Sequence, residues 1–143
     1  MDLKNKRKWL GRILIGFVLL MNLQCSILFL FQPEEFVAGF ELVGESGRAY
    51  VRGIGLLFLM WNIPYFVAVL DPIKYRISLY EAIVMQSIGL AGETILVLTL
   101  PGGHPQLVNT LSRFIIFDGL GLVSLLASAW ITSGYGEIHP INT

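Results

Sequence analysis

Residues 107–131 read LVNTLSRFIIFDGLGLVSLLASAWI, an apolar run that is interrupted by the charged residues Arg113 and Asp118. A transmembrane α-helix needs about 20 consecutive, mainly apolar residues to cross the hydrocarbon core of a bilayer. Three further stretches meet this requirement: 9–31, 51–70 and 77–100. Short links join the four spans, so neighbouring spans should pack side by side. The sequence therefore predicts an all-α integral membrane protein, an antiparallel four-helix bundle that forms a single domain over 1–143.

The overall composition agrees with a location in the lipid bilayer. Hydrophobic residues make up 55% of the chain and charged residues only 14%, which is too apolar for a water-soluble domain of this size. Ten basic and ten acidic residues cancel, so no net charge favours a nucleic-acid partner. Cys25 is the only cysteine, which excludes a disulfide or a thiolate metal cluster built by this chain alone.

Basic residues are concentrated in two places, the N-terminus and the link between the second and third spans. They are Lys4, Lys6, Arg7, Lys8, Arg12, Lys74 and Arg76. Lysine and arginine are enriched on the cytoplasmic side of membrane proteins. We therefore expect both termini to be cytoplasmic.

The connections between the spans carry their own signals. Pro33 followed by two glutamates is typical of a helix start, and the apolar residues that follow fall on one face. We predict a short amphipathic helix over 33–43, lying in the membrane interface, ahead of a turn at 44–47. In the second span Pro64 predicts a kink after Asn62. The tail, 133–143, is predicted to be irregular.

Polar residues deep inside the spans are the best indication of function. A charge at the centre of a lone membrane helix costs about 2.5–3.5 kcal/mol on the insertion scale, so each needs a partner. From the rise of about 1.5 Å per residue, these groups fall in the outer layer or near the midplane. We predict that they form one buried polar network or ligand site: Arg52, Asn62, Gln86, Glu93, Arg113 and Asp118.

Three interpretations of this network are open. Arg52 with Glu93, and Arg113 with Asp118 or Glu93, could be ion pairs that only fix the helix packing. The same residues could instead form the walls of a small-ligand site or part of a proton relay, which are common roles of ionisable groups inside membranes. They could also contact another subunit.

Recognisable catalytic patterns are lacking in this sequence. It contains no P-loop, dinucleotide fingerprint, serine nucleophile elbow or HExxH motif. His104 and His139 fall on opposite sides of the membrane in the predicted topology, so they cannot share a metal or a haem. We therefore predict no catalytic residues, no metal site and no obligatory cofactor, and we favour a protein that is not an enzyme. A bound lipid or quinone is compatible with the network.

One segment resembles a known group of membrane proteins. From Phe31 the chain reads Gln32, Pro33, Glu34, Glu35 and Phe36, then a glycine-containing turn, then Arg52 and Gly53 at the start of an apolar helix. This arrangement resembles the small four-helix proteins of the DoxX-like group, and within it the BphX-like proteins. The resemblance implies a protein of the bacterial inner (cytoplasmic) membrane. It also implies a bioenergetic partner, because some DoxX-like proteins are thought to belong to quinone-linked or thiol-redox systems.

Two hypotheses of function follow. The first is a non-catalytic accessory or assembly subunit of a larger, energy-transducing membrane complex, which would dock through Phe114, Ile115, Ile116 and Phe117. The alternative is a protein that binds a small or quinone-like molecule, or a redox-linked membrane enzyme. In that case Arg52 would hold an anionic or quinone-like head group, and a carboxylate of Glu93 or Asp118 would move a proton.

Overall fold

A computed structural model describes residues 2–135, which form helices and no β-strand. Four helical stretches are long and apolar enough to cross a membrane, so the predicted all-α four-helix architecture of a membrane protein is confirmed. The elements are α1 (Leu3–Phe31), α2 (Glu34–Val37), η1 (Ala38–Phe40), α3 (Gly44–Trp61), α4 (Ile63–Leu70), α5 (Arg76–Thr99), α6 (Pro105–Thr132) and η2 (Ser133–Tyr135). The predicted tail begins with η2, and the rest of it, including His139, lies outside the described residues.

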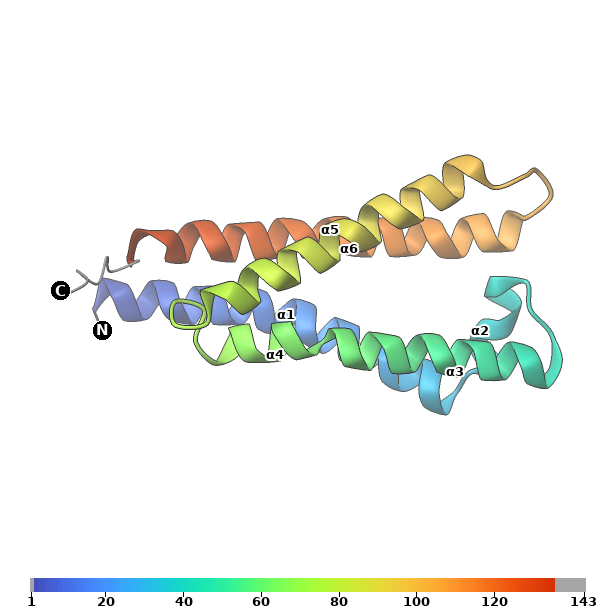
Figure 1. Ribbon diagram of the computed structural model, residues 1–143, viewed down its shortest axis with the longest axis horizontal. Coiled ribbons are helices and arrows are strands. Elements are labelled where there is room, and N and C mark those ends of the chain that lie inside the picture. Colours follow the sequence, from blue (N-terminus) through green and yellow to red (C-terminus); the bar gives the residue numbers. More distant parts are fainter. Residues whose placement is uncertain (1, 136–143) are drawn as a thin grey trace, which may run out of the picture.

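The helices are arranged around α1 (Figure 1). α1 packs against α3, α4 and α6, and α5 packs against α4 and α6. α3 and α5 are not packed against each other to a comparable extent in the described part of the chain. The beginning of α1 and the end of α6 lie at the same end of the bundle (Figure 1), as an even number of spans requires. We call this the terminal end, and the other the distal end.

The link between α4 and α5 is fixed at the terminal end by charged groups. The carboxylate of Asp71 accepts a hydrogen bond from the ammonium of Lys8 and two more, both 3.2 Å, from the backbone N–H groups of Ile73 and Lys74. Arg12 donates to the backbone oxygen of Val69 at 2.9 Å. The two groups of basic residues that the sequence predicts to be cytoplasmic therefore share one end.

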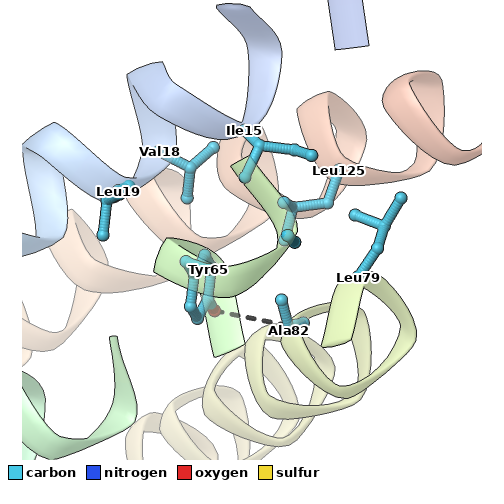
Figure 2. Packing of buried hydrophobic residues seen from close by; sticks show 8 residues of the cluster. Ile15, Val18, Leu19, Tyr65, Leu79, Ala82 and Leu125 are labelled. Carbon is cyan, nitrogen blue, oxygen red and sulfur yellow. Dashed lines mark hydrogen bonds between the residues drawn. The ribbon is translucent and has the colours of Figure 1, made fainter. Parts of the chain in front are cut away.

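A hydrophobic core joins the helices in the part of the bundle toward the terminal end, and Figure 2 shows its packing from close by. Every one of the four spanning stretches contributes, and the side chains are at least nine-tenths buried. The members are Ile15, Val18, Leu19, Tyr65, Ala68, Leu79, Ala82 and Leu125. In a membrane this close packing is itself a driving force for helix association, because lipid tails are as apolar as the core.

An aromatic cluster closes the distal end. The Phe29 ring is surrounded by four other phenylalanine rings at centroid distances of 4.6–6.2 Å. They belong to α2, η1, α3 and α6, namely Phe36, Phe40, Phe58 and Phe114. The segment after α1 therefore caps the bundle.

This capping segment differs from the single helix predicted over 33–43. It is split into α2 and η1 and ends at Phe40, because Glu41 adopts a left-handed conformation with φ 55°. Glu41 then accepts hydrogen bonds from the backbone N–H groups of Gln106 (3.1 Å) and Leu107 (3.2 Å). The N–H groups in the first turn of any α-helix have no acceptor within the helix. Glu41 supplies an acceptor for two of these groups in α6.

The second span also differs from its prediction. α3 begins at Gly44, so the residues predicted as a turn, 44–47, form its first turn. Hydropathy marks only the apolar part of a helix, and this polar turn extends beyond it. The predicted kink is confirmed, since α3 ends at Trp61 and α4 begins at Ile63. Pro64 explains the break because it lacks the N–H that would continue the helical hydrogen bonds.

Candidate ligand site

A partly open cavity of about 280 Å³ lies between the hydrophobic core and the aromatic cluster. Its polar lining residues are Asn22, Cys25, Asn62, Tyr65, Gln86, Glu93 and Asp118, and its aromatic walls are Phe58, Trp61, Phe114 and Phe117. Met85, Ile88 and Gly89 complete the lining. Counted along α5 at 1.5 Å per residue, Gln86 and Glu93 lie about 15 Å and 26 Å from Arg76. The cavity therefore occupies the middle and the distal half of the membrane-spanning region.

The break between α3 and α4 places Asn62 in this cavity. The backbone N–H of Asn62 bonds to Leu59 at 3.3 Å, as in a tighter 3₁₀ turn, which leaves the carbonyl of Phe58 without its helical partner. The side-chain amide of Asn62 replaces that partner and donates to the Phe58 oxygen at 2.6 Å. Its own carbonyl oxygen, Oδ1, is buried and accepts no hydrogen bond from the described residues.

Hydrogen bonds connect α4, α5 and α6 along one wall of the cavity. The hydroxyl of Tyr65 donates to Oε1 of Gln86 at 2.6 Å, and the Ala82 carbonyl lies 3.3 Å from the same hydroxyl (Figure 2). Nε2 of Gln86 donates to Oδ1 of Asp118 at 2.8 Å. Gln86 is 4% exposed, so its amide is held in one orientation by partners on both sides.

Two glycines make room for these polar side chains. An added Cβ on Gly89 would collide with Oδ2 of Asp118, and one on Gly121 would lie 2.7 Å from Nε2 of Gln86. Small residues let helices approach closely inside a membrane. At these two positions they also admit a carboxylate and an amide between α5 and α6.

Glu93 lies on the same helix as Gln86 but takes no part in the hydrogen-bonded wall. Its residue is partly buried, and its Oε2 atom is buried with no hydrogen-bond partner among residues 2–135. Burying a carboxyl oxygen without a hydrogen-bond donor costs folding free energy. Glu93 and Asn62, which both line the cavity, therefore each contain a buried oxygen atom without a hydrogen-bond partner among residues 2–135.

The mouth of the cavity opens sideways between α3 and α5. Trp61 and Ile88 are the exposed members of its lining, at 49% and 66% of their full exposure. They belong to the two helices that do not pack closely together. Ile88 lies about 18 Å along α5, well inside the membrane-spanning part. The exposed part of the lining therefore lies at a depth where a membrane-spanning helix contacts lipid.

The structure brings together four of the six residues predicted for the polar network. Asn62, Gln86, Glu93 and Asp118 line the cavity, whereas Arg52 and Arg113 are exposed and do not. The expected ion pairs of Arg52 and Arg113 with the two carboxylates are wrong for the described residues. Each arginine lies about 12 Å from the distal end of its helix, and a long side chain can extend from there to the head groups.

The predicted docking residues do not form one outward face. Phe114 and Phe117 line the cavity, Ile115 is half-buried, and Ile116 is 64% exposed. Four consecutive helical residues point in different directions around the helix, which explains the division.

Sequence reasoning missed Asn22, Tyr65, Phe58 and Trp61 as cavity residues. Asn22 carried a usable signal, because it is one of the few polar residues in the first span. Tyr65 and the aromatic residues carried none, since aromatic side chains are common on lipid-facing surfaces. The described residues contain no group of three His, Cys, Asp or Glu side chains placed to hold a metal ion.

Comparison of the chain with protein-family models, curated proteins and solved structures gives no significant match. The similarity to DoxX-like and BphX-like proteins accordingly stays a prediction from the sequence pattern.

Proposed function

We propose that this chain is a non-catalytic membrane protein that binds a small amphipathic molecule taken up from the bilayer. The observation that carries the proposal is the cavity itself, which is lined by two acidic side chains and two buried amides that form no ion pair with a cation of the described residues. Polar groups inside a membrane that only fix helix packing are expected to satisfy one another. Here Asn62 and Glu93 retain unsatisfied acceptors.

The size and shape of the cavity fit part of a larger molecule. About 280 Å³ is just below the usual range for small-molecule pockets, which begins at about 300 Å³. A polar head group would fill it, while an apolar chain would pass between Trp61 and Ile88 into the lipid. Lipids, quinones and lipophilic amines can all reach such a mouth by diffusion within the bilayer.

The cavity favours binding over the accessory-subunit hypothesis. Half of the proposed docking face, Phe114 and Phe117, forms the cavity wall and is not available to a partner protein. Arg52, which was expected to hold the head group, does not line the cavity. The head group would instead be held by Asn62, Gln86, Glu93 and Asp118.

We further propose that the terminal end faces the cytoplasm of a bacterial inner membrane. The clustering of basic side chains at this end supports the orientation. In a Cys25→Ser background, a cysteine at Asn5 should be labelled by an impermeant maleimide only after lysis of spheroplasts. A cysteine at Gly102 should be labelled in intact ones. The reverse pattern would invert the topology.

Binding is tested by purifying the tagged protein from its native membrane in mild detergent and identifying bound molecules by native mass spectrometry. We expect one small molecule per chain. Gly89→Ala should lose it, because the added methyl displaces the carboxylate of Asp118. Gly92→Ala is the matched control on the same helix, since a Cβ there meets no atom within 4 Å.

Two results would contradict the proposal. If neither the wild type nor the Gly92→Ala variant carries a small molecule, the binding function fails. If a protein partner co-purifies in stoichiometric amount, and Gly89→Ala leaves it bound, the accessory-subunit hypothesis is correct instead.

A further inference from the structure

The charge inside the cavity is one-sided. Glu93 and Asp118 both line it, and no lysine, arginine or histidine of residues 2–135 does. A carboxylate or phosphate head group would therefore meet two acidic side chains and no cation with which to pair. A cationic head group would supply the counter-charge that Arg52 and Arg113 do not.

The hydrogen-bonding groups of the cavity are also one-sided. The donors of Asn62, Gln86 and Tyr65 already have acceptors within the protein. Of the other side-chain donors in the lining, the amide of Asn22 donates to the hydroxyl oxygen of Tyr65, and the thiol of Cys25 is only a weak donor. The cavity therefore has few strong donors left for a ligand.

The unsatisfied atoms are both acceptors, Oδ1 of Asn62 and Oε2 of Glu93. Asn62 is 3% exposed, so its orphaned oxygen is fully within the protein. A head group that brings only carbonyl oxygens, such as a quinone, would leave both atoms unpaired. One that brings N–H donors would satisfy them.

The walls suit a cation as well. Phe58, Trp61, Phe114 and Phe117 place four aromatic rings around the same space. Aromatic faces attract ammonium groups, most strongly where water is excluded. The rings also give an apolar surface to the carbon chain next to the charged nitrogen.

From these three features we propose that the molecule bound in the cavity is a lipophilic amine, whose protonated primary or secondary nitrogen lies between Asn62 and Glu93. This inference rests on the binding function proposed above and specifies its ligand class. The amine would enter between α3 and α5, place its N–H groups on the orphaned oxygens, and leave its chain beside Trp61.

Trp61 provides a direct reporter of binding. A Trp9→Phe/Trp130→Phe variant keeps Trp61 as the only tryptophan of the chain. Its fluorescence is measured in lipid nanodiscs during titration with dodecylamine, 1-dodecanol, sodium dodecanoate and dodecyltrimethylammonium. The main chain of each probe has twelve carbon atoms, the carboxylate carbon of dodecanoate included, and the probes differ in the head group.

We expect saturable binding of dodecylamine that is at least about tenfold tighter than binding of 1-dodecanol, and no saturable response to dodecanoate. Dodecyltrimethylammonium should bind more weakly than dodecylamine, since it has no N–H for the orphaned oxygens. Glu93→Gln should weaken dodecylamine binding at least about tenfold and leave 1-dodecanol unchanged. Glu81→Gln is the matched control, because Glu81 is exposed on the same helix and does not line this cavity.

The outcomes separate this inference from the function on which it rests. Equal affinity for the amine and the alcohol, or for the amine and its trimethylammonium analogue, would overturn the amine assignment while leaving a binding site. If Glu81→Gln weakens dodecylamine binding as much as Glu93→Gln does, the selectivity comes from surface charge, and the amine assignment is again overturned. No saturable response to any probe would count against the cavity as a binding site. Asp118→Asn repeats the test if Glu93→Gln does not fold.

Discussion

Nε2 of Gln86 lies 2.8 Å from Oδ1 of Asp118 and joins α5 to α6 next to the cavity. Oε1 of the same Gln86 amide accepts a hydrogen bond from the hydroxyl of Tyr65. The Gln86 side chain on α5 therefore connects groups on α4 and α6. The bond holds a carboxylate that no cation of the described residues neutralises.

Gln86→Leu should therefore destabilise the bundle. A hydrogen bond to a charged group contributes about 1.5–3 kcal/mol, and the loss should be of this order. The free energy of unfolding can be measured by titration with sodium dodecyl sulfate in mixed micelles. Gln24→Leu is the control, because Gln24 is exposed on α1 and its replacement should change the free energy by little. Equal effects of the two changes would show that the Gln86 bond contributes nothing specific.

Gly55→Ala should weaken the contact between α1 and α3. An added Cβ would lie 2.9 Å from Cβ of Phe29 and 3.0 Å from the backbone oxygen of Ser26, and backbone cannot move aside cheaply. Overpacking of this kind costs about 1–3 kcal/mol. Gly53→Ala, two residues earlier on α3, meets nothing within 4 Å and should be neutral or stabilising. Thermal unfolding of both variants gives the comparison, and similar melting temperatures would contradict the close approach.

The contact of Glu41 with α6 should make stability depend on pH. The hydrogen bond with His104 lowers the pKa of Glu41, partial burial opposes this, and the backbone N–H groups of Leu107 and Gln106 lower the pKa further. A carboxylate whose pKa is lower in the folded state stabilises the fold above its ordinary pKa of 4.5. This contribution is lost as the pH falls through the folded value.

The test of that pH dependence is the difference in melting temperature between the wild type and Glu41→Gln. The difference should be largest near pH 6 and should shrink as the pH is lowered toward 3. Glu35→Gln is the control for an exposed glutamate of the same connection. A difference that is constant across this range would exclude a titrating role of Glu41.

Asp71→Ala should destabilise the protein more than Lys8→Met does. The ion pair between these residues is partly exposed, and such pairs contribute about 0–1 kcal/mol. Asp71 also accepts the N–H groups of Ile73 and Lys74, whose loss should add about 0.5–1.5 kcal/mol. Unfolding in mixed micelles measures both variants, with Lys6→Met as an exposed control. If the two losses are equal, the backbone contacts of Asp71 do not contribute.

The sequence by itself determined the properties that depend on one helix at a time. Long apolar runs gave the four spans, and Pro64 gave the break after Asn62, because both are consequences of local backbone chemistry. Distances along each helix were also accessible, since the helical rise is fixed. The sequence did not predict the polar first turn of α3, which begins at Gly44, because hydropathy detects only the apolar part of a helix.

Only the tertiary structure decided which polar groups meet. The direction in which a side chain points depends on how each helix is rotated against its neighbours, and that rotation is set by the packing of Gly55, Gly89 and Gly121 on other helices. Glu93 and Arg52 were expected to lie in one polar network, yet Glu93 lines the cavity and Arg52 is exposed. A long arginine can reach the head groups from its depth, whereas the shorter carboxylate side chains of Glu93 and Asp118 stay among the helices.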